Sequence, residues 1–226
     1  TRCADVTGVQ TCALPISDDA WTATWMLTAH VRLLVEPGWS LEHNQRVHVH
    51  LGTAEVLARC VLLEEAALAP GDSGWVQLRL EQPLVARAGD RLVLRAYSPV
   101  VTIGGGTVAE PAPPKRRVLP EEVRHSLGAL VEPEAEAGLP ALLDLAAWRG
   151  VGIERIPLDA GTPASDTEDR VRAAEASGAL RAGDLLFSAR TAASAEDLIM
   201  DAVEEGHRRD PLRLEVPLAP LRAALP

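Results

Sequence analysis

The sequence predicts a multidomain chain in which an all-β, six-stranded antiparallel barrel is followed by one or more small α/β modules. Two observations support this prediction. Between residues 17 and 110, apolar and polar residues alternate in short runs that turn residues separate, which is the pattern of half-buried strands. After residue 110 a proline-rich stretch follows, and the apolar spacing changes to the 3.6-residue period of amphipathic helices.

Six strands are expected in the barrel, because six runs alternate between an apolar and a polar face. They cover residues 25–33, 47–51, 56–60, 75–80, 91–96 and 101–103. Turn residues such as Pro37-Gly38 and Pro70-Gly71 lie between the runs. Short strands with this spacing favour a closed antiparallel barrel, since closure leaves no strand edge open to aggregation.

The fifth and sixth runs hold residues that we single out for function. One face of the fifth run is apolar, so Arg91 and Arg95 project together from the other face. Three glycines, Gly104, Gly105 and Gly106, follow the sixth run. Glycine suits positive φ angles or the close approach of two backbones, and either would explain three in succession.

Residues 111–137 are expected to form a semi-stiff, proline-rich linker with a short helix, because residues 110–120 read EPAPPKRRVLP. Residues 138–191 then show a helix, a short extended segment, a second helix and a two-stranded ribbon. Either Asp166 or Thr167 can cap that second helix, and Gly178 follows its end. This order of elements predicts a winged-helix module.

A weak internal repeat predicts the start of a second such module over residues 192–226. A helix at residues 195–208 is followed, after one short segment, by Pro217-Leu218, just as a helix at residues 139–149 is followed by Pro157-Leu158. The two Pro-Leu pairs lie 217 − 157 = 60 residues apart, and a fixed spacing of this kind indicates a tandem array. We expect the second copy to be truncated before its recognition helix.

Residues 1–16 are expected to lie outside the fold. The run VTGVQTCALPI at residues 6–16 resembles the in-frame translation of a sequencing adapter, and the alternative is an ordinary flexible terminus. On the first interpretation Cys12 has no structural meaning.

Composition argues against several classes of protein. The formal net charge of −10 argues against a protein that coats nucleic acid along its whole length, although a local basic patch is compatible with it. No apolar run is long enough to cross a membrane and no signal peptide is recognisable, so we expect a cytoplasmic protein. Three cysteines without a CxxC spacing favour neither disulfides nor zinc, and Cys60 is expected to be a small buried residue.

The sequence also lacks a nucleotide-binding motif. No phosphate-binding loop of the form G-x-x-x-x-G-K-[ST] occurs, and the only lysine, Lys115, lies in the proline-rich stretch. The three consecutive glycines cannot replace it, because no helix start with a lysine follows them. We therefore expect that this chain neither binds nor hydrolyses GTP and is not an enzyme.

Three blocks of sequence resemble one domain of a known family. Residues 46–59 (RVHVHLGTAEVLAR), 70–83 (PGDSGWVQLRLEQP) and 87–106 (RAGDRLVLRAYSPVVTIGGG) are similar to the third domain of translational GTPases of the elongation factor Tu class. Within that class they resemble most the selenocysteine-specific elongation factors, the SelB family. Residues 207–222 are similar to the start of the second winged-helix module of that family.

The resemblance implies a barrel that contacts the acceptor and T stems of an aminoacyl-tRNA through the sugar-phosphate backbone. On that basis Arg91 and Arg95, followed by Arg87 and Arg59, are the expected tRNA contacts, because a guanidinium fits a phosphate group. The open alternative is a set of salt bridges from these arginines to surface carboxylates, namely Glu64, Glu65 or Glu81.

His48 and His50 share one face of the second strand, a spacing that a metal site can use. The sequence suggests no third ligand, so we assign both histidines to a polar barrel face near bound RNA or a neighbouring domain. The second helix of the predicted module carries two arginines among acidic residues and is nearly neutral. That charge favours a spacer or protein-facing unit over a reader of nucleic acid.

The leading hypothesis is therefore part of a selenocysteine-specific elongation factor. The resemblance implies selenocysteinyl-tRNA, an mRNA hairpin beside a recoded stop codon and the ribosome as partners of an intact, monomeric factor. GTP and Mg²⁺ would be bound elsewhere in that factor, with no cofactor in this chain. One alternative is a DNA-binding regulator with a β-barrel sensor, which predicts a ligand cavity in the barrel and a basic helix at residues 166–177. Another translational GTPase of the class is a third possibility and would lack the module repeat.

Overall fold

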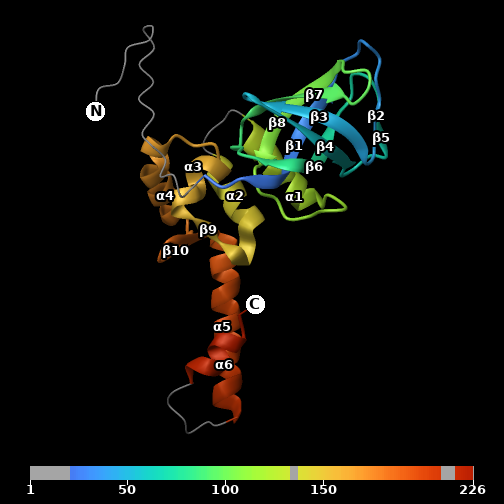
Figure 1. Ribbon diagram of the computed structural model, residues 1–226. Coiled ribbons are helices and arrows are strands. Elements are labelled where there is room, and N and C mark those ends of the chain that lie inside the picture. The colour runs from blue at the N-terminus through green and yellow to red at the C-terminus, as the bar shows by residue number, and fades with distance from the viewer. Residues whose placement is uncertain (1–20, 133–136, 210–216, 226) are drawn as a thin grey trace, which may run out of the picture.

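The computed structural model of the 226-residue chain describes residues 21–132, 137–209 and 217–225. A barrel of strands lies beside a group of short helices, and α5 (Ala189–Arg209) extends away from both (Figure 1). The sequence predictions for residues 1–16, and for the short segment before Pro217, lie outside the described residues.

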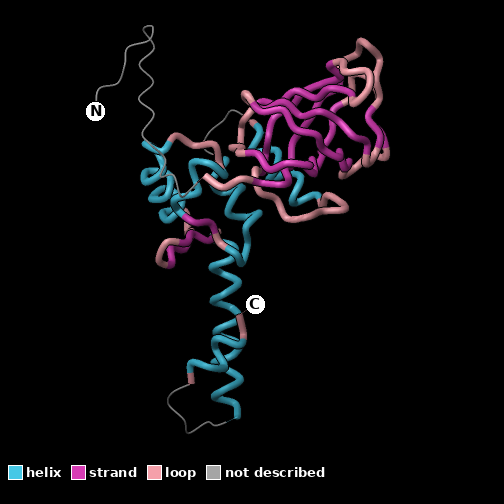
Figure 2. Tube along the Cα trace, in the orientation of Figure 1, coloured by secondary structure: helices cyan, strands magenta, loops and turns pink. Residues whose placement is uncertain are grey.

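The first part is a closed barrel of six antiparallel strands, as the alternating pattern predicts. Its strands follow one another around the barrel in the order β1-β6-β4-β3-β7-β8. Their bounds are Thr24–Leu33 (β1), Gln45–Leu51 (β3), Ala54–Leu62 (β4), Ser73–Leu84 (β6), Arg91–Ala96 (β7) and Thr102–Glu110 (β8). A small ribbon of β2 (Leu41–Glu42) and β5 (Ala67–Leu68) lies at the end of the barrel away from the helices (Figure 2).

Aliphatic side chains fill the barrel interior. Leu27, Val49, Leu78 and Leu94 come from four different strands and are completely buried. The polar residues between them face outward, so the predicted facing of these strands is confirmed. Cys60 is also buried in the interior, and this burial raises the pKa of its thiol to about 12.

The three consecutive glycines lie within β8, not after a strand as the sequence suggested. β8 runs between β1 and β7, and at Gly104 and Gly106 the backbones come very close. A Cβ atom on Gly106 would lie 2.2 Å from the carbonyl oxygen of His30, and one on Gly104 would lie 2.5 Å from that of Arg32. Neither glycine has a positive φ, so close backbone approach is the reason for glycine here.

The short helix expected in the linker at residues 111–137 is present, and the described residues 111–132 contact the barrel. Within them, α1 (Glu121–Val131) lies against the outside of the barrel, where Leu127 and Leu130 are buried in one cluster with Trp75. The physical reason is that this part of the barrel is apolar on its outer face as well and needs a cover. The outward apolar residues concerned are Val61, Leu63 and Trp75.

The second part contains short helices and a three-stranded sheet. Its elements are α2 (Gly138–Ala146), η2 (Ala147–Arg149), β9 (Val151–Gly152), η3 (Ile153–Arg155), α3 (Ile156–Asp159), η4 (Ala164–Asp166), α4 (Thr167–Ala176), β10 (Leu180–Ala182) and β11 (Leu185–Phe187). The sheet order is β10-β11-β9. Helix, short strand, helices and ribbon follow one another in the order that the sequence predicts.

The core of this second part is continuous with the cluster under α1. Leu143, Ile156 and Leu186 are buried in it, from a helix, a helix and a strand. α4 ends before Gly178, which has a φ of +96°, as expected for a residue just past a helix end. Asp166 occupies the N-cap position of α4, but its side chain makes no capping hydrogen bond.

α5 is longer than the predicted helix, and the expected boundary between residues 191 and 192 lies inside it. Its start is capped by Ser188, whose hydroxyl oxygen accepts a hydrogen bond from the N–H of Thr191 at 3.1 Å. Thr191 is the only buried residue of α5, and α6 (Leu218–Ala223) packs back against this helix. None of the helices in the described part of the chain is long and apolar enough to span a membrane.

Candidate nucleic-acid interface

One side of the barrel, over β3, β4, β6 and β7, carries a row of three arginines on its outer face. Arg46 lies directly opposite Arg59 on β4, and Arg59 lies directly opposite Arg79 on β6. We call these three residues the arginine row. Like charges opposite one another on a sheet are destabilising. The arginine row therefore lowers the stability of the fold, and a bound anion would offset this repulsion.

Glu81 supplies one counter-charge to the arginine row. Arg46 donates to both of its oxygens, at 2.7 Å from Nε and 2.6 Å from Nη2. The hydrogen bond from Arg46, together with the charges of Arg46 and Arg59, holds the pKa of Glu81 below its ordinary value. Arg59 is exposed and forms no ion pair among the described residues, and the buried Nε of Arg79 has no hydrogen-bond partner there.

Tyr97 lies beside the arginine row and offers an aromatic surface. The guanidinium of Arg46 lies 4.8 Å from the centre of its ring, and the ring of His48 stacks on it at 6.0 Å and 19°. Tyr97 is 48% exposed. Exposed rings beside arginines are surfaces on which nucleic-acid bases stack. Sequence analysis did not select Tyr97, although the outward alternation of Arg91 and Arg95 continues to it.

The predicted residues His48, His50 and Arg95 lie next to the row. His48 is opposite Arg95 on β7, and its Nδ1 lies 2.9 Å from Oε1 of Glu55. The Nε2 of His50 lies 3.8 Å from the same oxygen. Arg95 donates to the carbonyl oxygen of Val100 at 3.3 Å. Within residues 21–132, 137–209 and 217–225, no three or more His, Cys, Asp or Glu side chains are grouped so that they could hold a metal ion.

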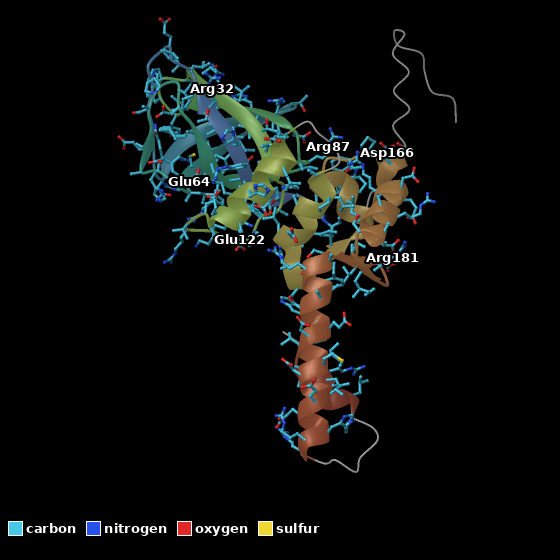
Figure 3. The ribbon with its side chains drawn as sticks, turned by 180° about the vertical axis from the view of Figure 1, so that it is seen from behind. Arg32, Glu64, Arg87, Glu122, Asp166 and Arg181 are labelled. Atoms are coloured by element: carbon cyan, nitrogen blue, oxygen red, sulfur yellow. The ribbon has the colours of Figure 1, made fainter. Side chains whose placement is uncertain are left out.

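The structure divides the predicted arginines between two places. Arg59 and Arg95 lie on the same side as the arginine row, whereas Arg91 lies at the other end of β7. Arg87 lies in the turn before β7, where its Nε is 3.6 Å from the carboxylate of Asp90 and where the barrel meets the helices (Figure 3). The predicted contacts therefore do not form one continuous surface.

Two of the three carboxylates suggested as alternative partners of these arginines, Glu81 and Glu64, bind other residues. Glu81 pairs with Arg46, and Glu64 lies 4.0 Å from the Nε of Arg124 in α1. Sequence analysis missed Arg46 and Arg79 as site residues, because only the strand register shows that they are neighbours of Arg59. The one available signal was that Arg59 and Arg79 are arginines at outward positions of predicted strands, and that Arg46 directly precedes another such strand.

α4 does not present a basic face. Arg172 donates to Asp169, and Arg181 of the ribbon lies 3.4 Å from Glu168 of α4. A groove of about 840 Å³ lies between α2 and α4, whereas the barrel interior is filled by side chains. These features do not fit a DNA-binding regulator with a ligand cavity in its barrel.

The fold and the site define a class of protein: a closed six-stranded barrel with an arginine-lined outer face, joined to a small α/β part. Residues 28–115 match the sequence model of the β-barrel domain of selenocysteine-specific elongation factors. The barrel of this chain is therefore similar to the β-barrel domain of selenocysteine-specific elongation factors.

Two other comparisons show the same likeness. The selenocysteine-specific elongation factor of Desulfomicrobium baculatum is 33% identical over 116 residues, which is 51% of this chain and 18% of that protein. The crystal structure of bacterial selenocysteine-specific elongation factor EF-Sec matches 91% of this chain and 30% of its own, with a TM-score of 0.57. At 16% identity, this second likeness shows the fold alone. The chain thus spans less than a third of either relative.

Proposed function

We propose that this chain is part of a selenocysteine-specific translation elongation factor, in which the barrel binds selenocysteinyl-tRNA and the α/β part is a winged-helix module. The arginine row beside Tyr97 is the observation that supports this most. In the intact factor the module and α5 would connect the barrel to a region that holds an mRNA hairpin near a recoded stop codon on the ribosome. GTP and Mg²⁺ would belong to another domain, because this sequence contains no phosphate-binding loop.

The arginine row suits the backbone of a folded RNA. A guanidinium presents two parallel N–H donors to a phosphate group, and double-stranded RNA is contacted mainly through phosphates and 2′-hydroxyls. Neighbouring strands lie about 4.8 Å apart, so the backbones of the three arginines span about 10 Å and their side chains can reach successive phosphates. Glu81 competes with phosphate for Arg46, so we expect RNA binding to break or share that ion pair.

Fluorescence anisotropy with selenocysteinyl-tRNA at several salt concentrations tests the proposal. Arg59→Ala and Arg79→Ala are each expected to weaken binding and to reduce the slope of log K against log salt by about one, because one phosphate contact and its released counterion are lost. Arg172→Ala on α4 is the matched control and should change neither quantity. Wild-type binding by both row variants, or an equal loss in the control, would contradict the proposal.

Arg91→Ala tests the hypothesis from sequence separately. Arg91 lies at the other end of β7 from Arg95, so a contact confined to the arginine row predicts wild-type affinity for this variant. A loss as large as that of Arg59→Ala would instead mean that the RNA covers the whole length of β7.

A further inference from the structure

Next to the arginine row, β1, β6 and β8 carry outward polar residues that are buried. Thr28, Gln77 and Glu110 are neighbours on β1, β6 and β8, and their exposed fractions are 0%, 0% and 7%. Like the three arginines of the row, they occupy positions of their strands that point away from the barrel interior. Pro114 and Arg116 of the proline-rich segment lie over Gln77 and Glu110 at this place.

Gln77, Glu110 and Arg116 hold that crossing segment, and we call them the polar clamp. The Nε2 of Gln77 donates to the carbonyl oxygen of Pro114 at 2.9 Å, and its Oε1 accepts from the N–H of Arg116 at 3.2 Å. The guanidinium of Arg116 donates to both oxygens of Glu110, one of them at 3.0 Å. These two charged side chains are only 11% and 9% exposed. A charge pair this deeply buried requires good geometry, so it holds the segment in one register.

A second joint uses different parts of the barrel. The N–H of Ala88, in the turn before β7, donates to the carbonyl oxygen of Leu158 at the end of α3, at 2.8 Å. Gly161 lies so close to this turn that a Cβ atom there would be 2.4 Å from the carbonyl oxygen of Ala88. The guanidinium of Arg155 donates to Oγ1 of Thr22, just before β1, at 2.9 Å. Because the two joints use different residues, the second part cannot rotate about one joint without breaking the bonds of the other.

An apolar core also crosses the boundary. One continuous cluster runs from Val61 and Trp75 on the barrel through Leu130 of α1 to Leu139 and Leu186 in the second part. Domains that move relative to each other are usually joined where few contacts cross, and a large apolar interface removes that freedom.

We propose that the barrel and residues 137–188 form one rigid body, in which the polar clamp sets the angle between the arginine row and α4. The shared core attaches the two parts. The clamp fixes the segment that leads into α1, and α1 packs against α2, so the clamp acts on the orientation of the second part through α1. The inference holds whether or not the barrel binds RNA.

Pulsed EPR between spin labels on the two parts tests this proposal on the full chain. The labels are attached at Thr53→Cys, in the exposed turn between β3 and β4, and at Ala176→Cys, at the exposed end of α4. Cys3 and Cys12 are replaced by serine. Cys60 is buried and stays unlabelled, and its protection from a thiol reagent reports that the barrel is folded. The chain with its clamp intact is expected to give one narrow distance distribution.

Three variants decide what the clamp does. Gln77→Leu removes both hydrogen bonds of Gln77 and is expected to widen the distribution at least twofold. Arg79→Leu, two residues along the same face of β6, is the matched control and should leave the width unchanged. Glu110→Leu combined with Arg116→Met replaces the buried pair by apolar residues, a change that is often neutral for stability. This double variant is expected to widen the distribution while its unfolding midpoint stays close to that of the wild type.

Two results would overturn the proposal. The first is a broad or multiple distribution in the chain with an intact clamp. The second is the wild-type width in the clamp variants while Cys60 stays protected. If Cys60 becomes reactive in Gln77→Leu, the barrel is unfolded in that variant. The width measured for the double variant then decides whether the proposal stands.

Discussion

Gln77 and Arg79 lie two residues apart on the same outer face of β6, yet their surroundings are opposite. Gln77 is completely buried and binds two backbone groups of the segment that crosses it. Arg79 lies beside Arg59 in the arginine row, and it is partly exposed. The alternation along a strand determines which side chains point out of the core. The path of the chain after β8 determines which of these outward side chains are buried and hold another segment in place.

The largest expected difference in unfolding free energy is between replacing Arg116 of the polar clamp and replacing Arg59 of the arginine row. Arg116→Met leaves Glu110 as a buried charge without a partner and is expected to lower the free energy of unfolding by about 3–5 kcal/mol. Arg59→Met removes an exposed side chain with like-charged neighbours and should change it by less than about 0.5 kcal/mol. Urea unfolding followed by tryptophan fluorescence measures both. Similar losses of unfolding free energy in the two variants would mean that the buried clamp and the exposed arginine row do not differ in their contribution to stability.

A smaller loss is expected at β8, which both sides of the barrel need for closure. Gly106→Ala would place a Cβ atom 2.2 Å from the carbonyl oxygen of His30, and overpacking of this kind costs about 1–3 kcal/mol. Gly128→Ala in α1 is the control, because no atom lies within 4 Å of its Cβ position. It should raise stability by up to about 1 kcal/mol through helix propensity. Thermal unfolding of both variants checks the opposite signs.

A gain in stability is expected on the covered side at Thr28. Its hydroxyl is buried and has no hydrogen-bond partner among the described residues. Thr28→Val removes this unsatisfied group and should raise the free energy of unfolding by about 1 kcal/mol. Ser188→Ala removes a hydroxyl that caps α5 and should lower it by about the same amount. A loss in Thr28→Val would show that the hydroxyl has a partner in solution.

The smallest effect is expected from the exposed ion pair of Arg46 and Glu81. Arg46 holds the pKa of Glu81 below its ordinary value of 4.5 in the folded protein. The pair therefore stabilises the fold above the unfolded-state pKa, and this contribution is lost as the pH falls through the folded-state pKa. Glu81→Gln should differ slightly from the wild type at pH 7, and the two unfolding midpoints should converge below about pH 4.5. A difference that persists at pH 2 would contradict this assignment.

Sequence analysis predicted the strands of the barrel and their facing, as well as the order of helices and ribbon after residue 137. It placed Arg59, His48, His50 and Arg95 on outward positions, which the structure brings together. It assigned residues 111–137 to a linker, because a proline-rich stretch does not show which surface it lies on. Arg91 was grouped with Arg95 because the two share one face of a strand, but they lie at opposite ends of β7, and Arg87 lies in the turn before it.

The sequence by itself determined where the strands and helices lie and which side chains leave the core, because periods of two and 3.6 residues are local properties of the backbone. Only the tertiary structure decided that residues 46, 59 and 79 are neighbours and that residues 111–120 cover Gln77. Both outcomes depend on strand register and chain path, which distant segments settle when the barrel closes. The exposed arginine row and the buried polar clamp beside it thus arise from the same alternating pattern.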